Sequence, residues 1–159
     1  MTRVGVDDGY RIWSRVYDRQ PNALLALEER VVIPALPPLA GRVFVDVGAG
    51  TGRWTAHASA RGARAFGIDL SAEMLAVAAR KPRTSGGLLR ACMRNIPLAS
   101  DSADIALCSF ALGHIPSPLP VLREMGRIAR QVIVTDMHPL AIAAGWKRSF
   151  RAERDVFEI

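Results

Sequence analysis

Glycines and acidic residues cluster after two apolar runs of the sequence. The first run leads into Asp46-Val47-Gly48-Ala49-Gly50-Thr51-Gly52. Alternate glycines permit positive φ angles and let a ligand approach the backbone without meeting a Cβ. The unpaired N–H groups at the start of a following helix suit a carboxylate or a phosphate. The same glycines could also form a tight turn that only packs the helix against the strand.

The second run ends in Phe66-Gly67-Ile68-Asp69-Leu70-Ser71. A carboxylate at the tip of a strand can accept hydrogen bonds from both hydroxyls of a ribose, and such charge-assisted bonds contribute about 1.5–3 kcal/mol each. Asp69 could instead interact only with the dipole of the next helix, because Ser71 is typical of an N-cap and Glu73 lies in the first turn. We expect the ribose contact.

The spacing of the glycines discriminates between nucleoside ligands. A dinucleotide-binding fingerprint reads G-x-G-x-x-G, whereas Gly48, Gly50 and Gly52 read G-x-G-x-G. The negative charge of Asp46 would repel a pyrophosphate but suits the ammonium of an amino acid or a sulfonium. The pattern therefore favours S-adenosylmethionine over NAD, and a dehydrogenase is the more distant alternative.

Short apolar runs alternate with helical ones along the chain, and they must position these residues. Strands are predicted at 42–47, 64–69, 88–92, 103–110 and 131–136, and helices at 22–33, 51–61, 71–81 and 118–130. Apolar strands separated by helices predict βαβ units, a parallel sheet covered on both faces and right-handed crossovers. The predicted fold is α/β, Rossmann-like and doubly wound. Ligands bind such a sheet beyond the carboxyl ends of its strands.

Composition narrows the class of protein. The chain has 159 residues, 50% of them hydrophobic and 23% charged, which indicates one globular domain. Disorder needs lower hydrophobicity, and no apolar run approaches the roughly 20 residues of a membrane span. The formal charge is +6, but the arginines are scattered among acids, so nucleic-acid binding is not favoured. Cys92 and Cys108 match no metal spacing, and we expect no metal and a cytoplasmic location.

The chain resembles the class I S-adenosylmethionine-dependent methyltransferases. The resemblance lies in VDVGAGTGRW (45–54), FGIDLSAEML (66–75) and IPLASDSADIALCSFALGHI (96–115). It covers about residues 10 to 139 and is closest to the small-molecule branch that contains the ubiquinone/menaquinone and malonyl-carrier-protein methyltransferases. It implies methyl transfer from S-adenosylmethionine to a small-molecule acceptor, with S-adenosylhomocysteine as product. A donor-binding but inactive or partner-dependent module is the alternative.

The resemblance also implies roles for individual residues. The residues implied to bind the donor are Asp46, Gly48, Ala49 and Gly50 at the methionine moiety, Asp69 at the ribose, Leu70 and Met74 beside the adenosyl group, Cys92, Met93 and Arg94 near the adenine, and Ser109 facing the methionine end. The family pattern usually has Asp where this chain has Cys92. A thiol is a poor acceptor, so we expect weaker donor binding by about 1–3 kcal/mol.

Three residues after the predicted strands are candidate catalytic bases. His114 follows the fourth strand, and Asp136 and His138 follow the fifth. Oxygen and nitrogen acceptors lose a proton during methylation, whereas a carbon or thiol acceptor need not lose it to the protein. Each histidine could equally cap a helix or bond a loop carbonyl. The Asn/Asp-Pro-Pro-Tyr run of enzymes acting on amide or adenine nitrogens is absent after the fourth strand, which disfavours nucleic-acid acceptors.

The amino-terminal segment carries Tyr10, Trp13 and Tyr17 on one helical face. Such spacing usually means packing, but in resembling enzymes a tyrosine-bearing segment covers the cofactor, so Tyr10 is included among the expected cofactor-binding residues. We divide the chain into a helical cap (1–40), a Rossmann-like core (41–139) and a tail (140–159).

The family sheet has seven strands in the order 3-2-1-4-5-7-6, whereas this chain supplies five, for which the resemblance implies the order 3-2-1-4-5. Val156 to Ile159 could begin a sixth. An uncovered apolar edge invites pairing. We therefore expect the carboxyl-terminal strands to be missing or supplied by another chain, with a homodimer or companion at the fifth strand. The alternatives are that 140–154 folds over this edge, or that the chain is a fragment. The methyl acceptor is not readable from the sequence.

Overall fold

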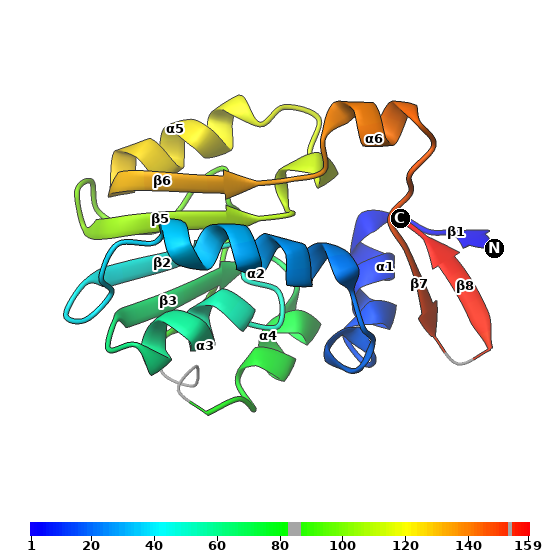
Figure 1. Cartoon of the computed structure of the whole chain (residues 1–159), viewed down its shortest axis with the longest axis horizontal. Helices are drawn as coiled ribbons and strands as arrows, with labels where there is room; N and C mark the ends of the chain where they lie inside the picture. Colours follow the sequence, from blue (N-terminus) through cyan, green and yellow to red (C-terminus); the bar gives the residue numbers. More distant parts are fainter. Residues whose placement is uncertain (83–86, 153) are drawn as a thin grey trace.

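A five-stranded parallel sheet forms the centre of the computed structural model, which describes residues 1–82, 87–152 and 154–159 (Figure 1). Its order is β4-β3-β2-β5-β6, and the strands are β2 (Val43–Val47), β3 (Arg64–Asp69), β4 (Leu88–Arg90), β5 (Ala103–Ser109) and β6 (Ala129–Thr135). This is the predicted order, so the Rossmann-like α/β fold is confirmed. The order reverses between β2 and β5, and a doubly wound sheet binds ligands at that point.

Helices cover both faces of the sheet. They are α2 (Ala23–Ala35), α3 (Arg53–Ala60), α4 (Ala72–Ala78) and α5 (Leu119–Ile128). Asn22 caps α2, since its side chain accepts from the N–H of Leu24 at 3.0 Å. Ser71 caps α4 in the same way through Met74. Pro34 lies within the last turn of α2, so this helix extends two residues beyond its predicted end at Ile33.

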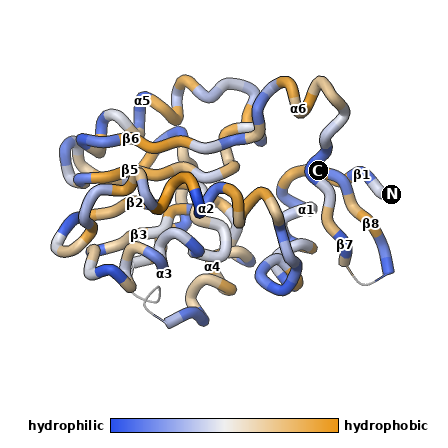
Figure 2. Tube along the Cα trace, viewed as in Figure 1, coloured by the Kyte–Doolittle hydropathy of each residue, from blue (hydrophilic) through white to orange (hydrophobic). Residues whose placement is uncertain are grey.

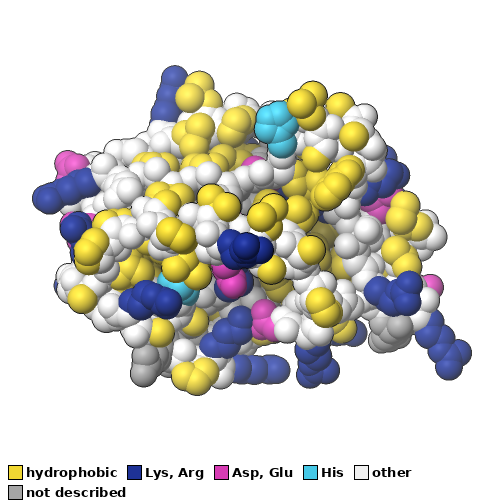
Figure 3. Space-filling model, viewed as in Figure 1, with side chains coloured by type: hydrophobic (Ala, Val, Ile, Leu, Met, Phe, Trp, Pro, Cys, Tyr) yellow, Lys and Arg dark blue, Asp and Glu magenta, His cyan; other side chains and the backbone are white. Residues whose placement is uncertain are grey.

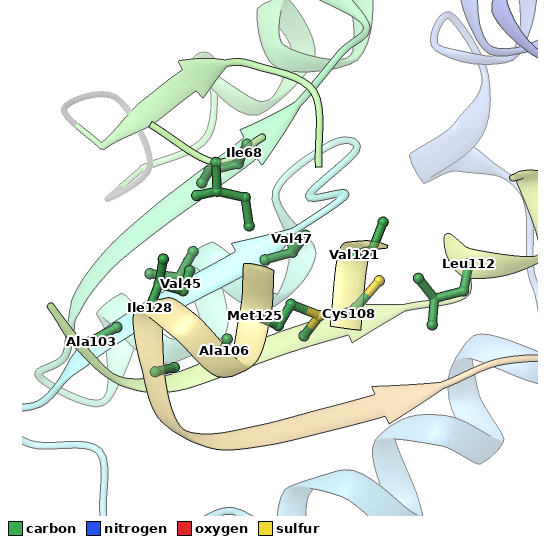
Figure 4. Close-up of a cluster of buried hydrophobic side chains, with 12 residues drawn as sticks. Val45, Val47, Ile68, Ala103, Ala106, Cys108, Leu112, Val121, Met125 and Ile128 are labelled. Carbon is green, nitrogen blue, oxygen red and sulfur yellow. The ribbon is translucent and has the colours of Figure 1, made fainter. Parts of the chain in front are cut away.

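The core follows from the two-residue period of the strands. Phe44, Ile105 and Leu107 point to the face covered by α2 and α3, where Trp54 and Val32 join them. The alternate residues point to the opposite face, which α5 covers with Val121, Met125 and Ile128 (Figure 4). Since both faces are apolar, β2 and β5 have hydrophobic residues at nearly every position (Figure 2). The exceptions are Asp46, a buried acid in the middle strand, and Asp104 and Ser109 of β5.

The two ends of the chain form a second, smaller sheet. Its order is β1-β8-β7, with β1 (Thr2–Arg3) parallel to β8 (Asp155–Glu158) and β8 antiparallel to β7 (Ser149–Ala152). Helix α1 (Val6–Trp13) and the short helix η1 (Tyr17–Arg19) lie between this sheet and the core. The amino-terminal segment and the tail, which the sequence separates, are therefore hydrogen-bonded to each other.

The tail does not extend the main sheet. The strand expected at 156–159 forms as β8, but in the smaller sheet, and 140–154 contributes α6 (Pro139–Ala143) and β7 instead of folding over β6. Among the described residues, β6 pairs only with β5. Its Val132 and Val134 are each 38% exposed. No helix within the described ranges is both long and apolar enough to cross a membrane.

Candidate functional site

A cavity of about 610 Å³ opens where β2, β3, β4 and β5 end, and α1 forms one of its walls. Every residue predicted to bind the donor lines it: Tyr10, Asp46, Gly48, Ala49, Gly50, Asp69, Leu70, Met74, Cys92, Met93, Arg94 and Ser109. The strand order places these residues together, because parallel strands bring their carboxyl ends to one edge of the sheet.

The glycine-rich turn forms the floor of this cavity. Gly48, Gly50 and Gly52 have φ angles of 74°, 53° and 74°, a region that residues with a Cβ adopt at a cost. The backbone N–H of Gly48 donates to the carbonyl of Ile68 at 2.8 Å, which ties the turn to the end of β3. A Cβ on Gly48 would lie 2.7 Å from the Cβ of Ala111, whereas one on Gly50 would meet nothing within 4 Å. Position 50 therefore presents bare backbone to open space.

Asp69 is held with both carboxylate oxygens oriented. Its Oδ2 accepts from the N–H of Gly50 at 2.7 Å, and its Oδ1 accepts from the N–H of Ser71 at 2.8 Å. Burial raises the pKa of Asp69, and these backbone bonds oppose the rise. Each carboxylate oxygen has a second lone pair, so the group retains capacity to accept from two hydroxyls of a ligand.

Asp46 supports the turn from inside the sheet. Its Oδ2 accepts from both the N–H and the hydroxyl of Thr55, each at 2.9 Å, which fixes the first turn of α3 to β2. Burial raises the pKa of Asp46 to about 6, against the lowering effect of the Thr55 bonds. A cation bound beside Asp46 would favour its charged form.

The segment after β4 forms the opposite wall. Cys92 is partly exposed there, and bonds from the backbone and side chain of Arg94 lower the pKa of its thiol. The N–H of Asn95 donates to the carbonyl of Cys92 at 2.9 Å and turns the chain at this point.

A buried ionic group adjoins the cavity near Ser109. Glu28 of α2 is 5% exposed and pairs with Arg53, which also donates to the Ser109 hydroxyl at 3.1 Å. The Arg53 guanidinium lies 4.8 Å from the centroid of the Trp54 ring. Sequence reasoning missed this group because Glu28 and Arg53 are far apart in the chain, and a glutamate on an apparently amphipathic helix reads as solvent-exposed.

His114 is the one predicted catalytic residue that lines the cavity. Its Nε2 lies 2.6 Å from the hydroxyl of Tyr10 and also contacts the guanidinium of Arg148. Burial first, and then the charge of Arg148, lower the pKa of His114 to about 4. His114 is therefore a neutral imidazole at physiological pH.

The structure places Asp136 and His138 outside the cavity wall. Asp136 pairs with Arg148 and accepts from the N–H of Gly113 at 2.6 Å. His138 is exposed and caps α6, its Nδ1 accepting from the N–H of Leu140 at 3.2 Å. Within the described ranges, no three His, Cys, Asp or Glu side chains are placed to share a metal ion.

Comparison with known protein families decides what this fold and cavity belong to. The family described as methyltransferase domain matches residues 45–133, which run from β2 through β6 and contain the glycine turn, Asp69 and the β5 end. The chain belongs to the methyltransferase domain family.

Relatives of this methyltransferase domain include quinone-biosynthesis enzymes. It is 36% identical over 102 residues to the ubiquinone biosynthesis O-methyltransferase of Methylococcus capsulatus, covering 62% of this chain and 43% of the relative. It is 33% identical over 97 residues to the demethylmenaquinone methyltransferase of Bacillus velezensis, covering 57% and 42%. The chain thus spans less than half the length of these two curated relatives.

A solved structure agrees over more of the chain. The crystal structure of an S-adenosylmethionine-dependent methyltransferase from Mesorhizobium loti superposes with a TM-score of 0.68 at 28% identity. The superposition covers 81% of this chain and 62% of that chain. This agreement supports the class I methyltransferase fold that the sequence motifs indicate.

Arg148 contacts His114 at the edge of the cavity, and no sequence pattern predicted this contact. Arg148 lies in the tail, beyond the matched residues, and its contacts depend on how the tail folds. Nothing in a Lys-Arg-Ser stretch near a chain end distinguishes it from a solvated surface arginine.

Proposed function

We propose that the cavity binds S-adenosylmethionine and that this methyltransferase domain transfers the methyl group to a small-molecule acceptor. The observation that carries the proposal is the juxtaposition of the positive-φ Gly48–Gly50 backbone with the Asp69 carboxylate, 2.7 Å from the Gly50 N–H. A donor nucleoside fits this arrangement, because bare backbone and an oriented carboxylate face the same cavity. When bound, the donor supplies an electrophilic methyl carbon on a sulfonium.

Each end of the donor would meet different chemistry. The ribose hydroxyls would donate to Asp69, and the methionine moiety would lie along Gly48–Gly50, near Asp46 and Ser109. The adenine would lie against Cys92, Met93 and Arg94, with Leu70 and Met74 beside the adenosyl group. These assignments follow from the resemblance to the class I methyltransferases, and each residue named lines the cavity.

The protein's contribution to such a reaction is mainly positioning, because displacement at a methyl carbon needs an in-line approach. Phe110, Ala111 and Ile115 follow β5 and line the same cavity, so they would border the acceptor. An acceptor oxygen or nitrogen has to lose a proton. Of the three predicted bases, only His114 borders the cavity.

Titration with S-adenosylmethionine, S-adenosylhomocysteine and NAD by calorimetry tests the proposal. We expect both adenosyl ligands to bind and NAD to give no heat beyond dilution. Binding of NAD alone would overturn the assignment. Turnover is then measured on a panel of thiol, hydroxyl, amine and carboxylate acceptors.

The second candidate function is a donor-binding module that needs a companion chain. Two observations favour it: the thiol of Cys92 at the adenine end, and the outer edge of β6, which pairs with no further strand in the described part of the chain and where Val132 and Val134 are exposed. On the face shown in Figure 3, Lys and Arg side chains are dispersed and hydrophobic ones spread over the centre, which suits a protein partner better than a nucleic acid. Donor binding without turnover on any acceptor supports this module.

A homodimer or companion at β6 makes a separate prediction about assembly. Gel filtration with light scattering at low micromolar concentration distinguishes the states. A dimer that becomes a monomer on Val132→Lys substitution supports pairing at β6, because a lysine on an edge strand opposes strand addition. A clean monomer in the unmodified chain excludes obligatory pairing with itself.

A further inference from the structure

We propose that Arg148 is a positioning residue, which holds α1 over the donor cavity through His114 and Tyr10, and that His114 acts in this chain of contacts as a hydrogen-bond acceptor and not as the base. The proposal rests on the proposed function for what the cavity binds. The contacts themselves are properties of the chain. We refer to Tyr10, His114, Asp136 and Arg148 as the relay.

Arg148 is the centre of the relay. Its side chain is 15% exposed, although it comes from the loop just before β7. The guanidinium donates to the carbonyl of Phe110 at 2.8 Å, to Nε2 of His114 and to the carboxylate of Asp136. One planar fork thus joins the segment after β5 to the segment after β6. Lysine has a single ammonium and cannot reproduce this geometry.

The hydrogen bonds determine the state of His114. A guanidinium can only donate, so Nε2 must be unprotonated and the imidazole proton lies on Nδ1. The Tyr10 hydroxyl approaches the same nitrogen at 2.6 Å. The groups that face His114 are Tyr10 from α1, Arg148 from before β7 and Asp136 from after β6. With two partners at Nε2, the lone pair that a base would use is already occupied.

The relay ends on the helix that closes the cavity. Val6, Asp7, Asp8, Tyr10 and Arg11 of α1 all line it. The hairpin that follows Arg148 supports the same helix, because Trp13 stacks on Phe150 with ring centroids 4.7 Å apart. A Cβ on Gly9 would also lie 2.6 Å from the side chain of Ile159, so α1 packs closely on the end of β8. Arg148 therefore links the segment after β5, at the rim of the cavity, to the pair of strands β7 and β8, which packs against α1.

The first experiment compares Arg148→Lys with Arg151→Lys, an exposed arginine of the same hairpin, in the full chain. Hydrogen exchange of the α1 amides, without ligand, reports how firmly the helix is held. We expect Arg148→Lys to speed exchange in α1 about tenfold or more and to weaken S-adenosylhomocysteine binding by a similar factor. Arg151→Lys should change neither. Equal exchange in the two variants would overturn the proposal.

The second experiment separates an acceptor from a base. Glutamine can place an amide oxygen near the position of Nε2 but has no titrating group, whereas leucine has neither. His114→Gln should keep S-adenosylhomocysteine affinity within about threefold of the unmodified chain, and His114→Leu should lose about tenfold. Nitrogen NMR of the His114 ring should show the neutral Nδ1–H form throughout the neutral pH range. A protonated Nε2, or equal losses in the two variants, contradicts the relay.

The two proposals fail in distinguishable ways. If the unmodified chain binds no adenosyl ligand, the proposed function fails. The relay is then tested only by the hydrogen exchange of the α1 amides in the Arg148→Lys and Arg151→Lys variants. If the ligand binds but Arg148→Lys affects neither exchange nor affinity, the relay fails and the proposed function stands.

Discussion

The departure at Cys92 from the family pattern leads to a quantitative prediction. Cys92 lies in the cavity wall just after β4, where a carboxylate could accept from the adenine amino group. Arg94 lowers the pKa of this thiol, and a thiol is a poor hydrogen-bond acceptor. Cys92→Asp should therefore tighten donor binding.

The magnitude follows from the competing partner. A hydrogen bond to a charged group contributes about 1.5–3 kcal/mol. Arg94 follows two residues later and lines the same cavity, so the new carboxylate would be shared between Arg94 and the ligand. We therefore expect a net gain of about 1–2 kcal/mol, which corresponds to about a five- to thirtyfold lower dissociation constant.

Calorimetry with S-adenosylhomocysteine measures this gain against two controls. Cys92→Asn supplies a neutral acceptor of the same size as Asp and should gain less. S-inosylhomocysteine lacks the adenine amino group, so its affinity should not improve in Cys92→Asp. An unchanged constant for S-adenosylhomocysteine, or an equal gain for both ligands, would refute the reasoning.

Three further predictions concern the glycine turn and the two acids. Asp69→Asn should weaken S-adenosylhomocysteine binding about tenfold or more by calorimetry, because a neutral amide has one acceptor oxygen where Asp69 has two that already bond Gly50 and Ser71; unchanged affinity would remove Asp69 from the site. Gly48→Ala should lower the free energy of unfolding in urea by about 2–4 kcal/mol, because φ is 74° and the new Cβ meets Ala111 at 2.7 Å; adding Ala111→Gly should restore only the part due to the contact. Burial raises the pKa of Asp46 from 3.8 to about 6, so the folded state binds this proton more tightly than the unfolded state. Stability from this group is therefore present at low pH and falls as pH rises through that interval. Asp46→Asn should flatten the slope of unfolding free energy against pH there, and an unaltered slope would show that Asp46 does not titrate in that range.

Local patterns predicted the part of the fold that local physics controls. The apolar character of 43–47 and 103–109 requires burial on both faces, and the glycines after β2 require a turn before α3. These features predicted a doubly wound parallel sheet and the edge where the cavity lies, whereas the strand order came from the resemblance to the methyltransferase family. The boundaries differ by a few residues, as at Pro34, where the last turn of α2 continues past the proline.

The carboxyl-terminal tail could not be predicted in the same way. Its short apolar segments read equally well as a sixth strand of the main sheet and as a separate hairpin. The stacking of Trp13 on Phe150 and the pairing of Thr2 with Phe157 involve residues from opposite ends of the chain. No local pattern encodes a contact of that kind, because its free energy depends on where the rest of the fold brings the two segments.

The features of the site also divide into those set by local sequence and those set by tertiary contacts. The types and spacing of Asp46, the glycines and Asp69 are local, so the sequence by itself determined the edge of the sheet where the cavity lies and the family of methyltransferase domains. Only the tertiary structure decided which groups contact His114 and Arg148. The state of an imidazole depends on its burial and on the groups that surround it, and those groups come from α1, the end of β6 and the loop before β7.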